Sequence, residues 1–390
     1  MKRNLPLLAL SQAALMTTVS LVLSSSALIG RQLASPDLAT VPLAIQYFAT
    51  MLLLYPAARL METHGRRTVF CGGALLGALG LALAAAGIRF GSFALFAGAG
   101  FLIGIFNAVG QYYRFAAADA VPVERKNIAI SLTLTGGVLA AIAGPLLARW
   151  TKEALTPSFY ASFLALSGVA LLGALLATGL KLPPMNPSQH AEKSRPLAEI
   201  AANPKFRLAV LGGSIGYAIM CLLMTATPLA MLCSRLGFAQ TATVIQWHVV
   251  AMFAPSFFTG SLLQRYGALP VMLCGCLLNL ASIAVSLNGE TLGYFEIALI
   301  LLGIGWNFLY VGATALLTET YRPAEKSRIQ ALNDSLVFFG VSVATLFSGR
   351  LVNTLGWQSV NIYASLPILI VMAAILGQMK WPRPVWKRAG

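Results

Sequence analysis

Apolar residues in this chain gather into long runs that recur at regular intervals and are separated by short polar stretches. Each run is long enough to cross the roughly 30 Å hydrocarbon core of a bilayer as an α-helix. The pattern therefore predicts an all-α membrane protein with twelve transmembrane helices. The predicted spans are 5–27, 38–60, 67–87, 91–113, 127–149, 157–180, 206–232, 240–263, 268–288, 292–318, 327–350 and 357–379.

Composition agrees with this pattern, because only 10% of the 390 residues are charged, against about 25% in soluble domains. The net charge of +15 could indicate a nucleic-acid partner, but its distribution argues against one. If the N-terminus is cytoplasmic, all but six of the 27 Lys and Arg residues fall on the cytoplasmic side, as the positive-inside rule requires. We therefore expect a multi-pass protein in the lipid bilayer with both termini cytoplasmic. The six exceptions are Arg31, Arg89, Arg149, Lys152, Arg235 and Arg350.

The long polar interruption between the sixth and seventh predicted spans divides the chain into two halves. It predicts an N-terminal six-helix half at 1–180, a cytoplasmic linker at 181–205 and a C-terminal six-helix half at 206–390. The halves also resemble each other, since Gly65 matches Gly267 and Glu124 matches Glu325 at offsets of about 200 residues. Duplication of a six-helix unit produces such a parallel repeat.

The loop after the second predicted span carries the first specific resemblance. Residues 58–67 read ARLMETHGRR, which resembles the loop G-x-L-A-D-R-x-G-R-R of the major facilitator superfamily, with Ala58 for the glycine and Glu62 for the aspartate. The resemblance implies a transporter whose two halves rock about a central cavity. It also implies that Glu62, Gly65, Arg66 and Arg67 form a conformational latch. An ordinary basic cytoplasmic loop is the alternative interpretation.

Two pairs of possible metal ligands lie in the C-terminal half, Met220 with Met224 and His248 with Met252. Positions i and i+4 share one face of a helix, so each pair projects together. Thioethers prefer soft monovalent copper, and a histidine within a membrane is costly unless it has a function. Methionine also packs readily in apolar cores, so the spacing alone leaves plain packing open.

Met-x3-Met in the seventh span followed by His-x3-Met in the eighth resembles the paired motif of CcoA-type bacterial copper importers, within the same superfamily. The resemblance implies an importer in the bacterial inner membrane that supplies cytoplasmic copper for assembly of cbb3-type cytochrome c oxidase. It implies a monomer, with a cytoplasmic copper chaperone as a possible downstream partner. Riboflavin carriers of the broader family lack the pairs, and the glycine-rich stretch 136–145 resembles superfamily exporters. A carrier of riboflavin or a drug is therefore the alternative.

Three further residues are accessory candidates. Cys221 and Cys233 could pass copper as thiolates or pack as inert thiols, and Asp334 could carry a coupling proton or pair with an arginine. The chain contains neither a nucleotide-binding loop nor a catalytic constellation, so we expect neither an enzyme nor a prosthetic group; copper is the expected cargo. A non-transporting copper receptor is disfavoured because no soluble metal-binding domain is present.

Overall fold

The computed structural model describes residues 3–122, 126–182, 195–322 and 325–379, and the described chain is helical without strands. The N-terminal half contains α1 (Asn4–Leu33), η1 (Pro36–Leu38), α2 (Val41–His64), α3 (Arg66–Arg89), α4 (Phe93–Gly110), α5 (Tyr113–Asp119), α6 (Lys126–Thr151) and α7 (Tyr160–Thr178). The remainder contains α8 (Leu197–Ala202), α9 (Pro204–Cys233), α10 (Phe238–Phe253), α11 (Ser256–Tyr266), α12 (Ala268–Leu287), α13 (Leu292–Thr318) and α14 (Lys326–Gln378).

These helices follow the predicted spans closely. The fourth span corresponds to α4, and the separate helix α5 begins at the end of that span and extends beyond it. The eighth span is divided into α10 and α11, with Pro255 at the break. The eleventh and twelfth spans form the single run α14, which turns at Gly356 with φ +78°. Among the described residues, nine helices are long and apolar enough to cross a membrane, with α14 counted once. The twelve-span architecture is consistent with this arrangement.

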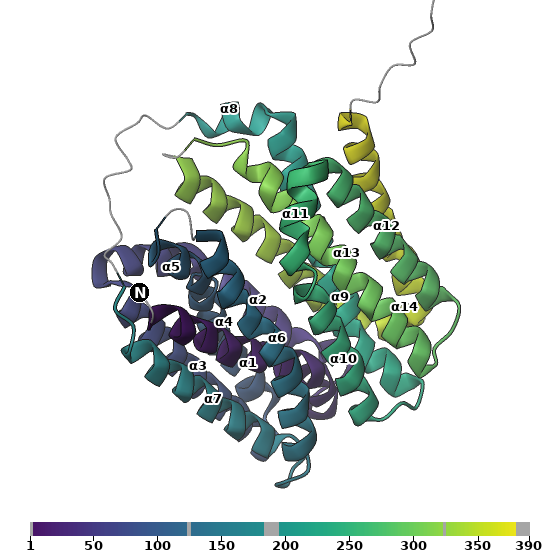
Figure 1. Ribbon diagram of the computed structural model, residues 1–390. Coiled ribbons are helices and arrows are strands. Elements are labelled where there is room, and N and C mark those ends of the chain that lie inside the picture. Colours follow the sequence, from purple (N-terminus) through teal and green to yellow (C-terminus); the bar gives the residue numbers. More distant parts are fainter. Residues whose placement is uncertain (1–2, 123–125, 183–194, 323–324, 380–390) are drawn as a thin grey trace, which may run out of the picture.

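The helices form two bundles that follow the order of the chain (Figure 1), α1–α7 in one and α9–α14 in the other. The short helix α8 lies in the predicted linker, of which residues 183–194 are outside the described chain. Asn203 caps the start of α9, because its side-chain oxygen accepts a hydrogen bond from Lys205 N at 2.9 Å. Pro204 is the first residue of this helix. A side-chain acceptor at the N-cap and proline at the first helical position both favour a helix start.

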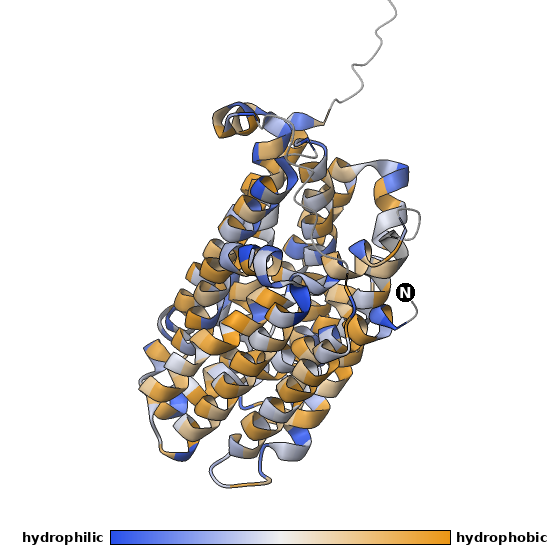
Figure 2. Cartoon of the chain, turned by 90° about the vertical axis from the view of Figure 1, so that its left-hand side faces the viewer, coloured by the Kyte–Doolittle hydropathy of each residue, from blue (hydrophilic) through white to orange (hydrophobic). Residues whose placement is uncertain are grey.

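Apolar residues cover the sides of the molecule and hydrophilic residues gather at its two ends (Figure 2). Large apolar side chains such as Leu175 and Ile370 are more than half exposed. Water would penalise this surface, whereas lipid accepts it, because the helices satisfy their own backbone hydrogen bonds. We call the end that carries α8, Gly65 and Gly267 the linker side, and the opposite end the far side.

The repeat predicted from sequence is visible in the backbone. Gly65 joins α2 to α3 with φ +79°, and Gly267 joins α11 to α12 with φ +82°. Both turns need a positive φ that residues with a Cβ rarely adopt. Deeper in the bundles, a Cβ at Gly104 would overlap the carbonyl oxygen of Gln46, and a Cβ at Gly303 would overlap that of His248. Matching helix pairs therefore approach closely at matching positions.

The two halves are joined at the far side. Several hydrogen bonds between the halves lie there, including those from Arg149 to Ala239 O and Thr243, and from Asn353 to Pro36 O at 2.8 Å. The rings of Phe159 and Phe238 also meet edge to face across this end, with centroids 5.0 Å apart. The structure is thus closed on the far side.

Candidate functional site

A cavity of about 100 Å³ lies between the two halves near the middle of the bundle. It is lined from the N-terminal half by α1, α2, α4 and α5, and from the C-terminal half by α9, α10 and α13. The lining residues are Gln12, Met16, Val19, Ser20, Leu23, Tyr47, Asn107, Gly110, Gln111, Arg114, Tyr217, Met220, Cys221, Met224, Val249, Met252, Phe253, Trp306 and Tyr310. A second hollow of about 590 Å³, between α6 and α10 at the far side, contains none of the predicted ligands.

Four of the nine lining residues from the C-terminal half contain sulfur. Met220, Cys221 and Met224 of α9 line the cavity together with Met252 of α10. Each of the four is at most 7% exposed. Three thioethers and a thiol facing one small cavity supply soft ligands without charge. We define these four residues as the sulfur wall.

His248 lies behind this wall, between α10 and α13, and is fully buried. Its Nδ1 is 2.7 Å from the carbonyl oxygen of Leu299. Because a carbonyl only accepts, Nδ1 carries the proton and donates, which leaves the lone pair of a neutral ring on Nε2. Nε2 is buried and has no hydrogen-bond partner in the described chain. This is the tautomer of a metal-binding histidine oriented by a backbone carbonyl, but His248 is not among the residues that line the cavity.

The rest of the cavity combines aromatic rings with polar groups. Trp306 and Tyr310 stack with centroids 5.2 Å apart and an interplanar angle of 11°, and Tyr217 meets both edge to face. Asn107 and Gln111 add amides, and Arg114 adds a guanidinium group. Such a surface can bind a flat ring and hydrogen-bond its edge.

The accessory candidates lie in different environments. Cys221 belongs to the sulfur wall, although it neighbours Met220 on the helix, whereas Cys233 is exposed at the far-side end of α9 near Arg31. Asp334 is partly buried in α14 and accepts a hydrogen bond from Asn333 Nδ2 at 3.1 Å. In the described chain, no ion pair joins Asp334 to an arginine. Its role in proton coupling stays a prediction.

The predicted latch residues have unequal surroundings. Arg66, with a side chain only 7% exposed, pairs with Asp119 at the end of α5 with an N–O distance of 2.5 Å. Glu62 instead pairs with Arg59 of its own helix at 3.4 Å and is exposed, as is Arg67. Gly65 supplies the turn that brings Arg66 toward α5. Asp119 therefore belongs with the latch candidates, although the loop pattern does not contain it.

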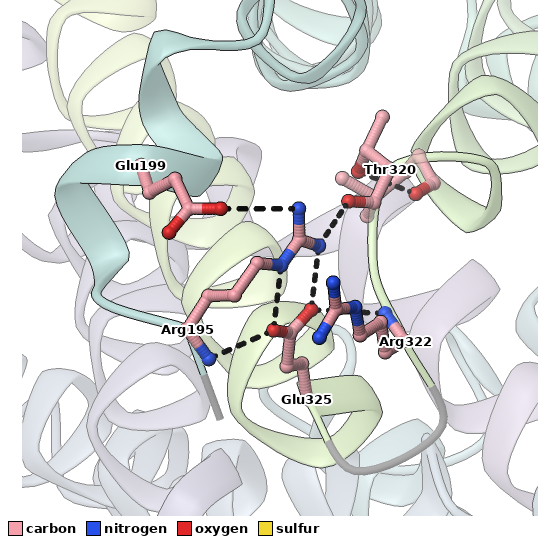
Figure 3. A network of polar contacts seen from close by, with 6 residues as sticks. Arg195, Glu199, Thr320, Arg322 and Glu325 are labelled. Carbon is pink, nitrogen blue, oxygen red and sulfur yellow. Dashed lines mark hydrogen bonds and ion pairs between the residues drawn. The ribbon is translucent and has the colours of Figure 1, made fainter. Parts of the chain in front are cut away.

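In the C-terminal half, the loop before α14 is held by an arginine from the linker (Figure 3). The Glu325 carboxylate accepts from Arg195 N at 2.9 Å, and from Nε and Nη2 at 2.8 Å each. It also accepts from Arg322 N, while Arg195 Nη2 reaches Thr320 O at 3.1 Å. Hydrogen bonding to the Arg195 guanidinium holds the pKa of Glu325 well below its usual range. We call this contact the linker clamp; Glu124, its repeat counterpart, is outside the described residues.

Several residues of the cavity and of the linker clamp could hardly be recognised as functional from the sequence. Arg114 follows an apolar span and could be taken for a basic residue at its cytoplasmic end. Arg195 is one of many basic residues in a polar stretch, and Trp306 and Tyr310 are four residues apart within an apolar run. Their functions depend on contacts between helices that are distant in sequence.

The two-bundle fold and its central cavity define a solute transporter of the membrane. The sequence profile of the Major Facilitator Superfamily matches residues 8–255 and 214–388. The chain belongs to this superfamily, whose members are transporters and not enzymes, as predicted from the loop at 58–67.

Known relatives extend this assignment. The riboflavin transporter RfnT of Brucella anthropi is 38% identical over 383 residues, covering 97% of this chain and 96% of the relative. The uncharacterized MFS-type transporter YddS of Bacillus subtilis is 26% identical over 90% of this chain and 83% of the relative. The crystal structure of the transporter FucP in its outward conformation has a TM-score of 0.65 at 16% identity, covering 97% of this chain and 100% of FucP. FucP supports the shared fold alone.

Proposed function

We propose that this transporter carries monovalent copper across the bacterial inner membrane toward the cytoplasm. The single observation that carries the proposal is the sulfur wall, which concentrates Met220, Cys221, Met224 and Met252 at one small cavity between the halves. Soft uncharged sulfur suits copper(I) and gives little to magnesium, calcium or manganese. The Nε2 of His248, which has no hydrogen-bond partner in the described chain, is a further candidate ligand on the helix that carries Met252.

The size of the cavity supports a small cargo in this conformation. Pockets for drug-sized molecules usually have volumes of about 300–1,000 Å³, whereas this cavity has about 100 Å³. Closure on the far side, together with a polar group at Arg114 toward the linker side, suits release of the cargo in the direction of the linker. Copper delivered this way would serve assembly of a cbb3-type oxidase, as the CcoA-type resemblance implies.

The second candidate is a carrier of an organic solute such as riboflavin, and the named relative favours this class over copper. RfnT is described as a riboflavin transporter and is similar over nearly the whole chain. The specific structural observation is the Trp306–Tyr310 stack with Tyr217 against it. A wider opening of the same cavity would let a flat ring insert beside these side chains.

Uptake of radioactive copper under reducing conditions separates the two candidates. Cells producing the wild-type protein should accumulate copper, and Met224→Ala or His248→Ala should abolish this accumulation without loss of membrane insertion. Cys71→Ala is the matched control, because Cys71 lies in α3 away from the cavity. Normal copper uptake by both site variants, or uptake of radioactive riboflavin in place of copper, would contradict the copper proposal.

A further inference from the structure

Hydrogen-bond donors without acceptors line the cavity beside the sulfur wall. In the described chain, Ser20 Oγ, Arg114 Nε and Trp306 Nε1 are buried atoms without a hydrogen-bond partner, and all three residues line the cavity. The side chains of Ser20 and Trp306 belong to residues that are 1% and 6% exposed. Buried donors normally have partners, because leaving one unsatisfied costs free energy.

The three donors come from different helices and converge only through the fold. Ser20 belongs to α1, Arg114 to the first turn of α5 and Trp306 to α13. Arg114 is the one charged residue among those described that line the cavity, and its guanidinium contacts the ring of Phe115 with 4.8 Å to the centroid. Asp334 lies outside the lining and forms no ion pair with Arg114 in the described chain, although the two groups interact electrostatically at longer range.

A bare copper(I) ion would fit this cavity poorly. Three thioethers and a neutral thiol bring no negative charge, so the ion would add a second positive charge to the Arg114 guanidinium in a low-dielectric space. The donors would also stay without acceptors. A cargo that brings an anionic group with oxygen acceptors solves both problems, since sulfur then binds the metal and the donors bind the oxygen atoms.

We infer that the cargo enters as an anionic copper(I) complex, with Arg114, Ser20 and Trp306 binding the oxygen acceptors of its ligand. This inference rests on the copper proposal and specifies the chemical form in which copper is carried. Arg114 supplies charge and an N–H group, whereas Ser20 and Trp306 each supply one neutral donor. Arg114 and Ser20 of the N-terminal half and Trp306 of the C-terminal half thus bind the ligand, and the sulfur wall of the C-terminal half binds the metal.

The test measures copper(I) uptake into vesicles reconstituted with the purified full-length protein, supplied in two forms. The thiosulfate complex is anionic and carries free oxygen atoms; the acetonitrile complex is cationic and carries none. We expect the wild-type protein to show a KM for the thiosulfate complex at least about tenfold lower, a difference that one charge-assisted hydrogen bond can supply. Arg114→Gln should raise that KM by about tenfold and leave the KM for the acetonitrile complex unchanged.

Three further variants distinguish loss of a specific contact from a general loss of folding or transport. Trp306→Phe keeps the ring but removes the N–H group, so it should raise the KM for the thiosulfate complex alone, by about threefold to tenfold. Arg114→Lys keeps the charge and should recover part of the preference. Arg89→Gln is the control, because Arg89 is exposed in the last turn of α3 and does not line the cavity; its two KM values should equal those of the wild type.

The outcomes separate this inference from the function on which it rests. Copper uptake without preference for the thiosulfate complex, or an equal loss of both forms in Arg114→Gln, would overturn the anionic complex alone. Absence of copper uptake in both forms, with the wild-type protein folded in the vesicles, would overturn the copper proposal and this inference together.

Discussion

Gln46 in α2 and His248 in α10 hold matching positions in the two halves, and each packs its carbonyl against a glycine of a partner helix. One turn further along, Thr50 matches Met252. In the N-terminal half, Thr50 Oγ1 donates to Gln46 O and Asn107 Nδ2 donates to Thr50. In the C-terminal half, the same positions provide an imidazole with a free Nε2 and a thioether at the cavity. The close contact at the glycine sets the distance between the two helices of each pair, while the side chains next to it differ between the halves.

The linker side shows a similar division. The N-terminal half pairs Arg66 with Asp119 within its own bundle, whereas Glu325 in the C-terminal half takes its arginine from the linker. Repetition therefore conserves the turns at Gly65 and Gly267, whereas Ala268 and Thr320 occupy the positions that match Arg66 and Asp119. A common scaffold thus supports an asymmetric cargo site and an asymmetric set of ion pairs.

The largest expected effect contrasts two methionines, Met16 from the N-terminal half and Met220 from the C-terminal half, that both line the cavity. Met220→Leu should lower copper uptake by at least about tenfold, because it removes a proposed copper ligand while nearly conserving volume. Met16→Leu in the N-terminal half should lower uptake less than about twofold, since volume is conserved and the sulfur wall remains. Radioactive copper uptake in matched vesicles measures both. Equal losses in the two variants would show that the site is shared by the halves.

The next contrast separates the two arginines of the predicted latch. Arg66→Gln removes the partner of Asp119 from a nearly buried position, so it should cost about 1–3 kcal/mol of stability and slow transport several-fold. Arg67→Gln should change stability by less than about 0.5 kcal/mol, as exposed substitutions usually do. Thermal unfolding in detergent and initial uptake rates test the pair. A larger effect at Arg67 would contradict the assignment of Arg66 as the latch residue.

The linker clamp predicts an acid-sensitive contribution to stability in the C-terminal half. Because the pKa of Glu325 is lowered in the folded protein, its contribution is complete above the unfolded value of about 4.3 and is lost as pH falls toward the folded pKa. Glu325→Gln should lower the midpoint of unfolding between pH 5 and 7 and flatten its fall below about pH 4.

Glu319→Gln is the matched control for this clamp, because Glu319 pairs with Lys205 while both side chains are about half exposed. Exposed pairs of this kind contribute roughly 0–1 kcal/mol, so the midpoint should hardly move. A wild-type midpoint that falls between pH 7 and 5, and no longer falls in Glu325→Gln, would contradict the lowered pKa.

The smallest expected effect is on stability, in variants of the two glycine turns. Gly65→Ala and Gly267→Ala meet no atom within 4 Å, so only the backbone conformation opposes them, with positive φ and extended ψ, at a cost of about 1–3 kcal/mol each. The two variants should lose equal stability. Gly168→Ala in α7 is the control: its Cβ also meets open space, and alanine should stabilise the helix by about 0.5–1 kcal/mol. Unequal costs at Gly65 and Gly267 would show that the turns are not equivalent.

Sequence reasoning predicted the parts of this molecule that depend on local patterns. Apolar runs predicted the spans, and the match of Gly65 with Gly267 predicted an internal repeat, which the two turns with positive φ share. The i, i+4 pairs correctly placed Met220 and Met224 on one face. The prediction could not assign His248 a position behind the wall, because that depends on the carbonyl of Leu299 in another helix. Asp119, Arg114 and Arg195 were missed for the same reason: their partners or cavity neighbours are distant in sequence.

Competition for copper uptake tests the central claim most directly. Purified wild-type protein in vesicles takes up radioactive copper(I) under reducing conditions while silver, manganese, zinc or riboflavin is present in excess. Because three thioethers bind soft monovalent ions, silver should block uptake, zinc should compete feebly, and manganese and riboflavin should leave it unchanged. Riboflavin blocking uptake where silver does not, or manganese inhibiting as strongly as silver, would show that the methionines are packing and that the cavity carries another solute.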